Sequence, residues 1–565
     1  MHRRFLYFLL LALAVAAAAI AAAGHVERQA VSGSEEGFGR VHMDISCSPA
    51  VAAEFDRALA LLHNFWYVRA LERFNAVLSE DPQCSMAYWG AAMTYNHPFW
   101  DPPSPADESA AWSLVQQGMS AKEASPREKL YLGAVAALYK DGGGGAKAVR
   151  DQSYRDAMAR TYAQFPDDET ALFYGLAILG AIPEGAKGFA QQEQAAQLFE
   201  TVYRRHPDHP GALHYLIHAN DDPVHAELGL PAARGYSQAA AAVPHALHMP
   251  SHIFTRLGYW EESAATNLQG WQVSEADVQR AGESGAYRDF HNLTYLEYAY
   301  LQLGRFHEAK RMLDIARAQY EALPDKTTAS DTPELQSRHV RGRTIYRVPD
   351  RVVYAYFDML VRYVVETGDW RAAAGVPLLV SSRDFLAMKL ELESMAAAAN
   401  LDPAGAEVAA RKLVQLAGEP GQHPFAKQVI TLQAKEAQAL AAKAGGDADG
   451  AVARMTEAVA IEDSIDDLSQ PPYPPIPANE LFGAILLDLH RPAEAGDRFT
   501  LALKRTPGRP KAVYGIARAA ESGGDNGAAT ERYQQFLKLW AKADPDRPEI
   551  AVAKRFLAGH STPPQ

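Results

Sequence analysis

The sequence predicts an all-α fold, a superhelical solenoid of stacked helical hairpins whose repeats are degenerate and interrupted by inserts. Three observations lead to this prediction. A pair of small and aromatic residues recurs at a fixed interval, the turns between the expected helices share a short motif, and no run of alternating β-branched residues lies between turn clusters. Hydrophobic residues make up 48% of the 565 and charged residues 22%, which excludes a disordered or fibrous chain.

The chain begins with a predicted signal peptide over residues 1–24, followed by a leader segment over 25–46. A basic start precedes a continuously apolar run from Phe5 to Ala23, and small residues surround the expected cleavage point. A run of this length could also span a bilayer as an uncleaved anchor, but its alanine-rich end favours removal. We therefore expect an exported protein, periplasmic or secreted, with no membrane span after signal removal.

The chain contains two cysteines, Cys47 and Cys84. An even pair in an exported protein meets an oxidising compartment, so a disulfide between them is the first expectation. Closing a loop of about 37 residues would stabilise the fold by about 3 to 4 kcal/mol in the chain-entropy model. The alternative is two buried free thiols.

The clearest internal repeat lies near the C-terminus, where Ala495 and Phe499 recur 34 positions later as Ala529 and Tyr533. A small residue lets two helices approach, and an aromatic ring one turn later fills the gap between them. This pattern resembles the tetratricopeptide repeat (TPR) family, whose 34-residue units are helical hairpins. The resemblance implies a solenoid with a concave groove and specifies no chemistry. The same pair occurs near the start of the chain as Ala70 and Phe74.

Inserts divide the expected repeats into two arrays. The N-terminal array should occupy 47–322, a polar insert 323–350, and the C-terminal array 351–565, with a proline-rich insert at 469–477. Between the best-matched repeats, the expected turns place glycine where one helix ends and an alanine-rich helix follows. These turns lie at Gly258, Gly304, Gly368 and Gly446.

The charge of the chain restricts its partners. The formal net charge is −13, and removal of Arg3 and Arg4 with the signal peptide would make it more negative, so a broad nucleic-acid footprint is excluded. The TPR resemblance implies a different partner, a peptide or another protein bound in the groove. Binding of an acidic peptide tail is not favoured, because histidine and aspartate stand where carboxylate-clamping members place lysine, arginine and asparagine.

Histidines concentrate in one region: nine of the 19 fall between residues 206 and 291. On a helix, residues three, four and seven positions apart share one face. One such stripe would carry His214, His218 and Asp221. A second would carry three more histidines, namely His245, His248 and His252.

Helix register, taken from the TPR resemblance, places these stripes on the first helices of three successive hairpins. In the family, groove-facing residues occupy the second, fifth, ninth, twelfth and thirteenth places of the first helix. His291 then matches the second place of its helix. The residues of the two stripes likewise match groove-facing places of the helices that carry them. Further groove-facing residues expected by the same reasoning, or beside the proline-rich insert, are His63, Asn96, His97, Asp222, Tyr298 and Glu480.

Imidazoles arriving from neighbouring helices are typical of a transition-metal site. The sequence therefore predicts a divalent metal (Zn, Cu or Fe), catalytic if a coordination position stays open. The alternatives are a hydrated polar groove and a protein-interaction scaffold without metal. Pro250 either kinks a helix between two of these histidines or begins a shorter helix. The expected ligands or their hydrogen-bonded partners are His214, His218, His245, His248, His252, His291 and Asp221.

Overall fold

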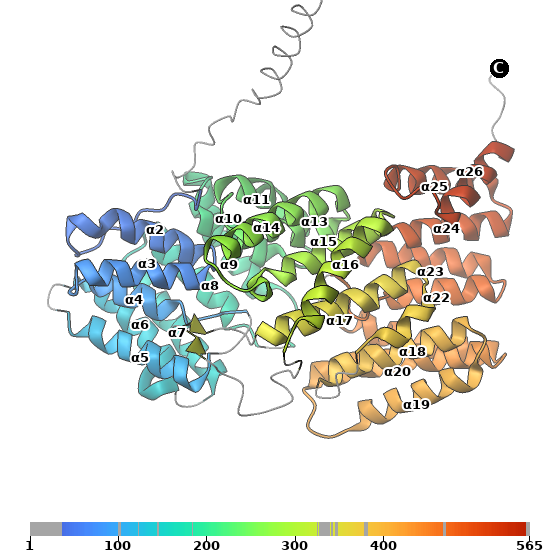
Figure 1. Cartoon of the computed structure of the whole chain (residues 1–565), viewed down its shortest axis with the longest axis horizontal. Coiled ribbons are helices and arrows are strands. Elements are labelled where there is room, and N and C mark those ends of the chain that lie inside the picture. The colour runs from blue at the N-terminus through green and yellow to red at the C-terminus, as the bar shows by residue number, and fades with distance from the viewer. Residues whose placement is uncertain are drawn as a thin grey trace, which may run out of the picture.

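The computed structural model describes residues 37–560 except 100–102, 122–123, 144–145, 184, 325, 327–338, 341–342, 345–347, 378–381 and 467–470. The expected signal peptide and residues 25–36 of the leader segment therefore lie outside the described residues, as does most of the polar insert at 323–350. Over the described residues the prediction of an all-α solenoid is confirmed, because helices follow one another in antiparallel pairs that stack into an elongated array (Figure 1).

The N-terminal part contains η1 (Pro49–Val51), α2 (Ala52–His63), α3 (Tyr67–Glu80), α4 (Ser85–Met93), α5 (Pro105–Met119), α6 (Pro126–Gly143), α7 (Lys147–Gln164), α8 (Asp168–Gly180), α9 (Ala190–Arg205), α10 (Pro210–Asn220), α11 (Ala226–Ala239), α12 (Pro244–His248), α13 (Pro250–Leu257), α14 (Trp260–Arg280), η2 (Gly285–Tyr287), α15 (Phe290–Gln302) and α16 (Phe306–Glu321).

The C-terminal part contains α17 (Val348–Thr367), η5 (Trp370–Gly375), α18 (Arg383–Ala399), α19 (Pro403–Gly418), α20 (Pro424–Ala444), α21 (Ala448–Asp463), α22 (Ala478–Asp488), α23 (Pro492–Arg505), α24 (Pro510–Gly523), α25 (Asn526–Leu539) and α26 (Pro548–His560). Between the two parts, β1 (His339–Val340) and β2 (Arg343–Thr344) form a two-residue antiparallel ladder with Val340 opposite Arg343. This ladder is the only sheet among the described residues.

The repeat works through aromatic rings set against glycines. The ring of Phe499 on α23 fills the space above Gly483 on α22 and Gly515 on α24, where a Cβ atom would overlap it. Phe199 on α9 covers Gly175 on α8 in the same way. A missing side chain on a first helix thus makes room for the ring on a second helix, which brings the helices close together.

The N-terminal end is fastened by a disulfide. Cys47 precedes η1, Cys84 is the N-cap of α4, and their sulfur atoms are bonded at 2.02 Å with the Cα atoms 4.7 Å apart. The structure thus contains no free cysteine among the described residues.

The apolar core changes ahead of the polar insert. One core cluster runs from Met43 to Phe254, and the main second cluster runs from Trp260 to Phe556. The α14–α16 region therefore packs with the C-terminal helices, although the insert at 323–350 separates them in sequence. The physical boundary between the two cores lies at the turn before α14.

Turns of the C-terminal helices dock against turns of the N-terminal ones. Gly258 (φ +73°) faces Gly508 (φ +69°) so closely that a Cβ on either would meet the other's backbone. The indole of Trp260 donates a hydrogen bond to the Gly508 carbonyl at 2.8 Å, and that of Trp540 donates to Gln302 at 2.9 Å. Glycine at these turns thus permits a close approach, in addition to ending a helix.

A buried ion network joins the same parts. Arg509 is fully buried and donates hydrogen bonds to Glu480 at 2.9 Å, to Glu366 at 2.8 Å and to the Tyr298 hydroxyl at 2.8 Å. Tyr298 and Glu480, expected to face a groove, are instead buried at this junction between α15, α17, α22 and α24. Losing one partner of such a network typically costs about 3–5 kcal/mol, because an uncompensated charge remains buried.

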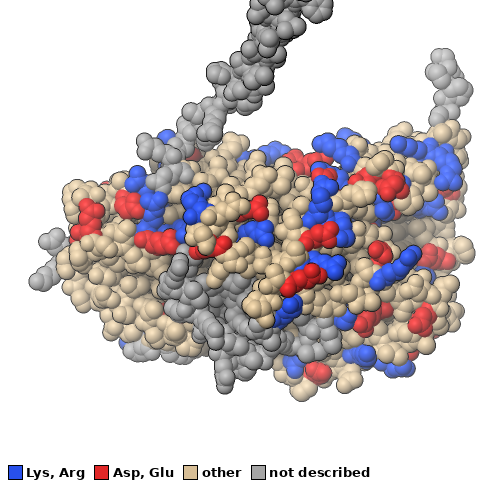
Figure 2. All heavy atoms as spheres, in the orientation of Figure 1, with Lys and Arg blue, Asp and Glu red and all other residues tan. Residues whose placement is uncertain are grey.

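The surface mixes both signs of charge. Figure 2 shows basic and acidic side chains interspersed over the C-terminal helices on the face drawn, without a broad basic area among the described residues.

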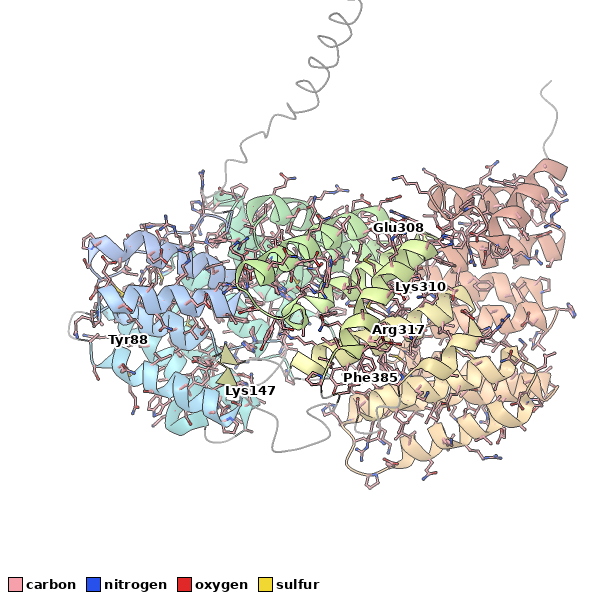
Figure 3. All side chains as sticks on the ribbon, in the orientation of Figure 1. Tyr88, Lys147, Glu308, Lys310, Arg317 and Phe385 are labelled. Atoms are coloured by element: carbon pink, nitrogen blue, oxygen red, sulfur yellow. A yellow bond between two sulfur atoms is a disulfide. The ribbon has the colours of Figure 1, made fainter. Side chains whose placement is uncertain are left out.

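Arg317 on α16, labelled in Figure 3, pairs with Glu321 at 2.8 Å. Phe385, labelled in the same view, stacks on Tyr354 with ring centroids 4.7 Å apart. Among the described helices, none combines the length and apolar character needed to span a bilayer.

Two buried glutamates lie between α18 and α20. Glu391 and Glu436 are 1% and 0% exposed, and Gln433 donates a hydrogen bond to Glu391 at 2.8 Å. Burial raises the pKa of Glu391 to about 7, and burial together with the charge of Glu391 raises the pKa of Glu436 well above its usual range. The pair is therefore protonated in the folded protein at pH values where the unfolded chain has lost both protons.

The glycine–ring packing predicts opposite effects for one substitution at two helical sites. Gly175→Ala should lower the thermal midpoint, because its methyl group overlaps the Phe199 ring. Gly133→Ala on α6 should raise the thermal midpoint slightly. Alanine favours the helix over glycine by about 0.5–1 kcal/mol, and no atom lies near the Cβ position at this site. Thermal unfolding followed by circular dichroism measures both, and equal shifts would contradict the packing account.

The glutamate pair predicts a pH effect on stability. The folded state holds more protons than the unfolded state above the unfolded pKa of about 4.5, so stability should fall as pH rises from there through 7 and beyond. Glu436→Gln should flatten the decline of the thermal midpoint between pH 5.5 and 8.5. Glu407→Gln, on the exposed face of α19, is the control and should leave the decline unchanged. If Glu436→Gln shows the same decline of the thermal midpoint as the wild type, the buried glutamate pair is not its cause.

Candidate metal centre

Six histidines meet on the first helices of three successive hairpins. His214 and His218 lie one turn apart on α10, His245 and His248 lie on α12, His252 on α13 and His291 on α15. Pro250 begins α13, which fits the tolerance of proline in a first helical turn. Of the two interpretations of Pro250, the structure therefore supports a new helix.

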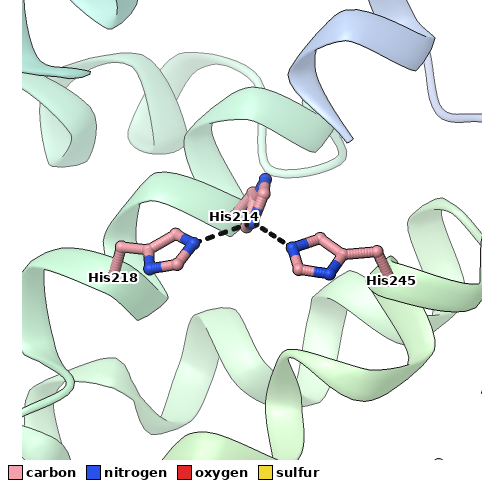
Figure 4. A group of neighbouring side chains, drawn as sticks. All are labelled: His214, His218 and His245. Carbon is pink, nitrogen blue, oxygen red and sulfur yellow. Dashed lines mark hydrogen bonds between the residues drawn. The ribbon is translucent and has the colours of Figure 1, made fainter. Parts of the chain in front are cut away.

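The first triad consists of His214, His218 and His245 (Figure 4). The Nε2 atom of His214 lies 3.1 Å from Nε2 of His218 and 3.2 Å from Nε2 of His245. His214 is fully buried, whereas the other two rings retain some contact with solvent. Three ring nitrogens thus point toward one position.

The second triad consists of His248, His252 and His291. The Nε2 atoms of His248 and His252 are 3.0 Å apart, and the His291 ring lies 4.5 Å from the His248 ring between centroids. His248 is fully buried, but His291 is exposed at the rim. The triads adjoin each other, since the rings of His245 and His248 are 6.1 Å apart.

The partners of the Nδ1 atoms decide where the protons are. Nδ1 of His214 faces the carbonyl of His63 at 2.7 Å, and a carbonyl can only accept a hydrogen bond. Nδ1 of His248 faces the side-chain oxygen of Asn267 at 2.8 Å, and the amide nitrogen of Asn267 is fixed by donation to Ser263. These Nδ1 atoms must carry hydrogen, which leaves the lone pair on Nε2 in the neutral rings.

Asp221 fixes the tautomer of His252 in the same way. Its carboxylate accepts from Nδ1 of His252 at 2.8 Å and from Arg256 at 2.6 Å. The buried Arg256 and His252 hold the pKa of Asp221 below its usual range despite the opposing effect of desolvation, so it stays ionised. Asp221 therefore lies behind the imidazole, on the side away from the converging Nε2 atoms.

The resulting arrangement places lone pairs against each other. Nε2 of His248 and Nε2 of His252 both lack hydrogen yet lie 3.0 Å apart. A shared proton is disfavoured, because desolvation lowers the pKa of His248 well below 6.5. Desolvation likewise lowers the pKa of every ring in the first triad, namely His214, His218 and His245. A bound cation would satisfy the two opposed Nε2 atoms of His248 and His252.

A neighbouring histidine cluster is satisfied without a metal. Glu169 accepts from Nε2 of His63 at 2.8 Å and from Nε2 of His209 at 3.1 Å, and the Tyr215 hydroxyl reaches Nδ1 of His63 at 3.0 Å. All of these groups are buried, and Gly211 leaves the space that the His63 ring fills. His63 thus contributes its carbonyl to His214, and its ring holds that end of α2 in place.

Three more expected groove residues, Asp222, His97 and Asn96, have contacts of other kinds. Asp222 accepts from the backbone of Val224 at 2.7 Å and of His225 at 2.9 Å, which shapes the turn after α10. The His97 ring stacks on Tyr67 with centroids 4.5 Å apart, and Asn96 is buried beside it in the chain.

Aromatic residues that sequence reasoning did not identify surround both triads. Phe65 and Phe99 flank the first, with the Phe99 ring 4.3 Å from that of His218. Tyr295 flanks the second, and its ring lies 4.7 Å from His248 and 5.0 Å from His252. Tyr295 is one helical turn after His291 on α15, a spacing that could have indicated it.

Comparisons with known proteins concern the fold. No protein-family model matches the chain, and no curated protein matches its sequence. Among solved structures, the human IFIT1 dimer with m7Gppp-AAAA is 12% identical over 81% of this chain and 90% of the other, with a TM-score of 0.33. The APC/C hetero-tetramer Cut9–Hcn1 is 12% identical over 77% of this chain and 83% of the other, with a TM-score of 0.27. Likenesses this distant say nothing about what the six histidines bind.

Proposed function

We propose that this chain is an exported solenoid of TPR type that binds two divalent transition-metal ions, one in each histidine triad. The convergence of the ring nitrogens carries the proposal. The Nε2 atoms of the pairs His214–His218, His214–His245 and His248–His252 lie 3.0 to 3.2 Å apart, and Nε2 of His214, His248 and His252 carries no proton. Imidazole nitrogens sharing one tetrahedral ion at about 2.0–2.1 Å would lie about 3.3 Å from each other. These three pairs are therefore close to the spacing that a metal requires, and all ligand atoms within each triad lie within 4.8 Å of one another.

The donor set favours zinc or copper over iron. All six donors are imidazoles, and Asp221, the carboxylate beside His252, is engaged by Arg256 and by Nδ1 of His252. Imidazole suits Zn, Cu, Fe and Ni, whereas open non-haem iron sites usually add a carboxylate ligand. The disulfide between Cys47 and Cys84 agrees with an oxidising, extracytoplasmic location.

Three protein ligands per ion leave a coordination position for water or a substrate. A metal in such a site supplies Lewis-acid or redox chemistry at that position. The chain's own residues set its conditions: Asn267, Asp221 and the His63 carbonyl orient the imidazoles and keep Nε2 free of protons. The alternative function, if no metal binds, is that of a scaffold that holds a peptide or partner protein against its concave surface.

The two-ion proposal predicts a specific series of metal stoichiometries. Wild-type protein dialysed against zinc should retain two equivalents, His218→Ala one, His252→Ala one, and the double variant none. His206→Ala with His307→Ala, two exposed histidines, should retain two. Elemental analysis gives the stoichiometries, and circular dichroism should show unchanged helix content, because the packing rings and glycines are untouched. Equal zinc content in wild type and the double variant would exclude the triads as the binding sites.

The hydrogen bond behind His252 predicts a selective loss of affinity. Asp221→Asn keeps the shape of the side chain but removes its negative charge. The amide can also turn its NH2 group, a donor, toward Nδ1 of His252 in place of an accepting oxygen. Zinc affinity at the second triad should fall about 10–100-fold, as is typical when such an orienting partner is replaced. The first triad is the internal control, and calorimetric titration should show its affinity unchanged. A uniform fall at both sites would point to a general loss of structure instead.

A further inference from the structure

The turn between α2 and α3 contains a conformational exception. Phe65 has φ +54°, in the left-handed region that bulky side chains avoid. At the corresponding turns after α13, α15 and α24, glycine takes this conformation, at Gly258, Gly304 and Gly524. Glycine at position 65 would therefore make the same turn without strain.

The side chain of Phe65 is also unusually placed. Among the described residues, the other non-glycine residues with positive φ are Leu401 and His490, and both extend into solvent at the surface. Phe65 is only 8% exposed. A strained backbone persists where the surroundings hold it, and such strain concentrates at functional sites.

The ring of Phe65 lies beside the first triad. Its ring centroid lies 4.4 Å from that of His214, 5.8 Å from His218 and 5.9 Å from His245. One phenyl ring thus approaches all three imidazoles. Phe99, from the segment after α4, stacks on His218 and lies 6.1 Å from Phe65 between ring centroids. Together the two rings form an apolar wall beside the converging nitrogens.

We infer that Phe65 is a selectivity residue, which restricts the open position of the metal in the first triad to ligands of two or three atoms. The inference rests on the proposed metal binding. Because the two phenyl rings lie 4.3 to 5.9 Å from the imidazole rings between centroids, we expect room for a small ligand such as dioxygen or azide and none for a ring-sized donor. The phenyl wall offers no hydrogen bond, so it does not favour a polar organic substrate.

The second triad lacks this restriction. His291 is exposed at its rim, and its aromatic neighbour, Tyr295, carries a hydroxyl group. The two positions therefore differ in the ligands they admit: the first admits only small ones, and the second is open from the side of His291. This asymmetry assigns small-ligand binding to the first triad.

The test isolates the first triad in full-length protein. In a His252→Ala background, cobalt is bound and its visible absorption is followed while azide or imidazole is added. With Phe65 present, azide should change the spectrum and imidazole should not. Phe65→Gly should bind imidazole at least about tenfold more tightly, with azide affinity unchanged within about twofold. Its thermal midpoint should fall, because the variant loses a buried ring, although relief of the backbone strain offsets part of that loss.

Two further variants make the outcome decisive. His490→Gly relieves the same backbone conformation at a remote surface position and should leave ligand selectivity unchanged. Phe65→Leu reports on selectivity if the glycine variant loses helix content, and it should give a smaller gain in imidazole affinity. Cobalt binding with equal imidazole affinity in all variants would overturn the selectivity role while leaving metal binding intact. Absence of bound cobalt in the His252→Ala background would overturn the proposed function itself.

Discussion

Close approach between helices, made possible where glycine faces an aromatic ring, is the constraint on which the rest of the structure depends. Phe199 and Phe499 occupy spaces that a single methyl group on the facing helix would close. Gly211 leaves such a space for the ring of His63, which lets α2 lie against α10 although helices α3 to α9 lie between them in the chain. Only with helices this close can imidazoles from α10, α12 and α13 bring their Nε2 atoms to 3.0–3.2 Å from each other, with the α15 imidazole of His291 beside them.

The hydrogen bonds behind the imidazoles turn this proximity into a chemical site. Backbone carbonyl, amide oxygen and carboxylate all accept from Nδ1, at His214, His248 and His252 respectively. A cluster of histidines held for packing would alternate donors and acceptors around the rings. Here the acceptors lie on the outside, and the lone pairs face inward where desolvation opposes protonation. This polarity of the cluster, more than the number of histidines, supports the proposal of a bound cation.

Much of this could be read from the sequence, because helical spacing alone places His214 beside His218 and His248 near His252. The 34-residue period also identified first helices, and therefore which histidines share a face. Other features depend on contacts that no local pattern encodes. Asn267 and the His63 carbonyl reach the site from distant positions in the sequence, and Arg509 draws Tyr298 and Glu480 out of the expected groove. Phe65 was missed because it stands where the repeat calls for glycine, which is also why it is informative.

Anomalous diffraction from crystals of the full-length protein loaded with zinc, recorded on both sides of the zinc absorption edge, tests the central claim most directly. We expect two peaks, one within about 2.0–2.2 Å of the Nε2 atoms of His214, His218 and His245, and the other equally close to Nε2 of His248, Nε2 of His252 and one ring nitrogen of His291. Zinc found only at surface carboxylates, with both triads unchanged and metal-free, would contradict it.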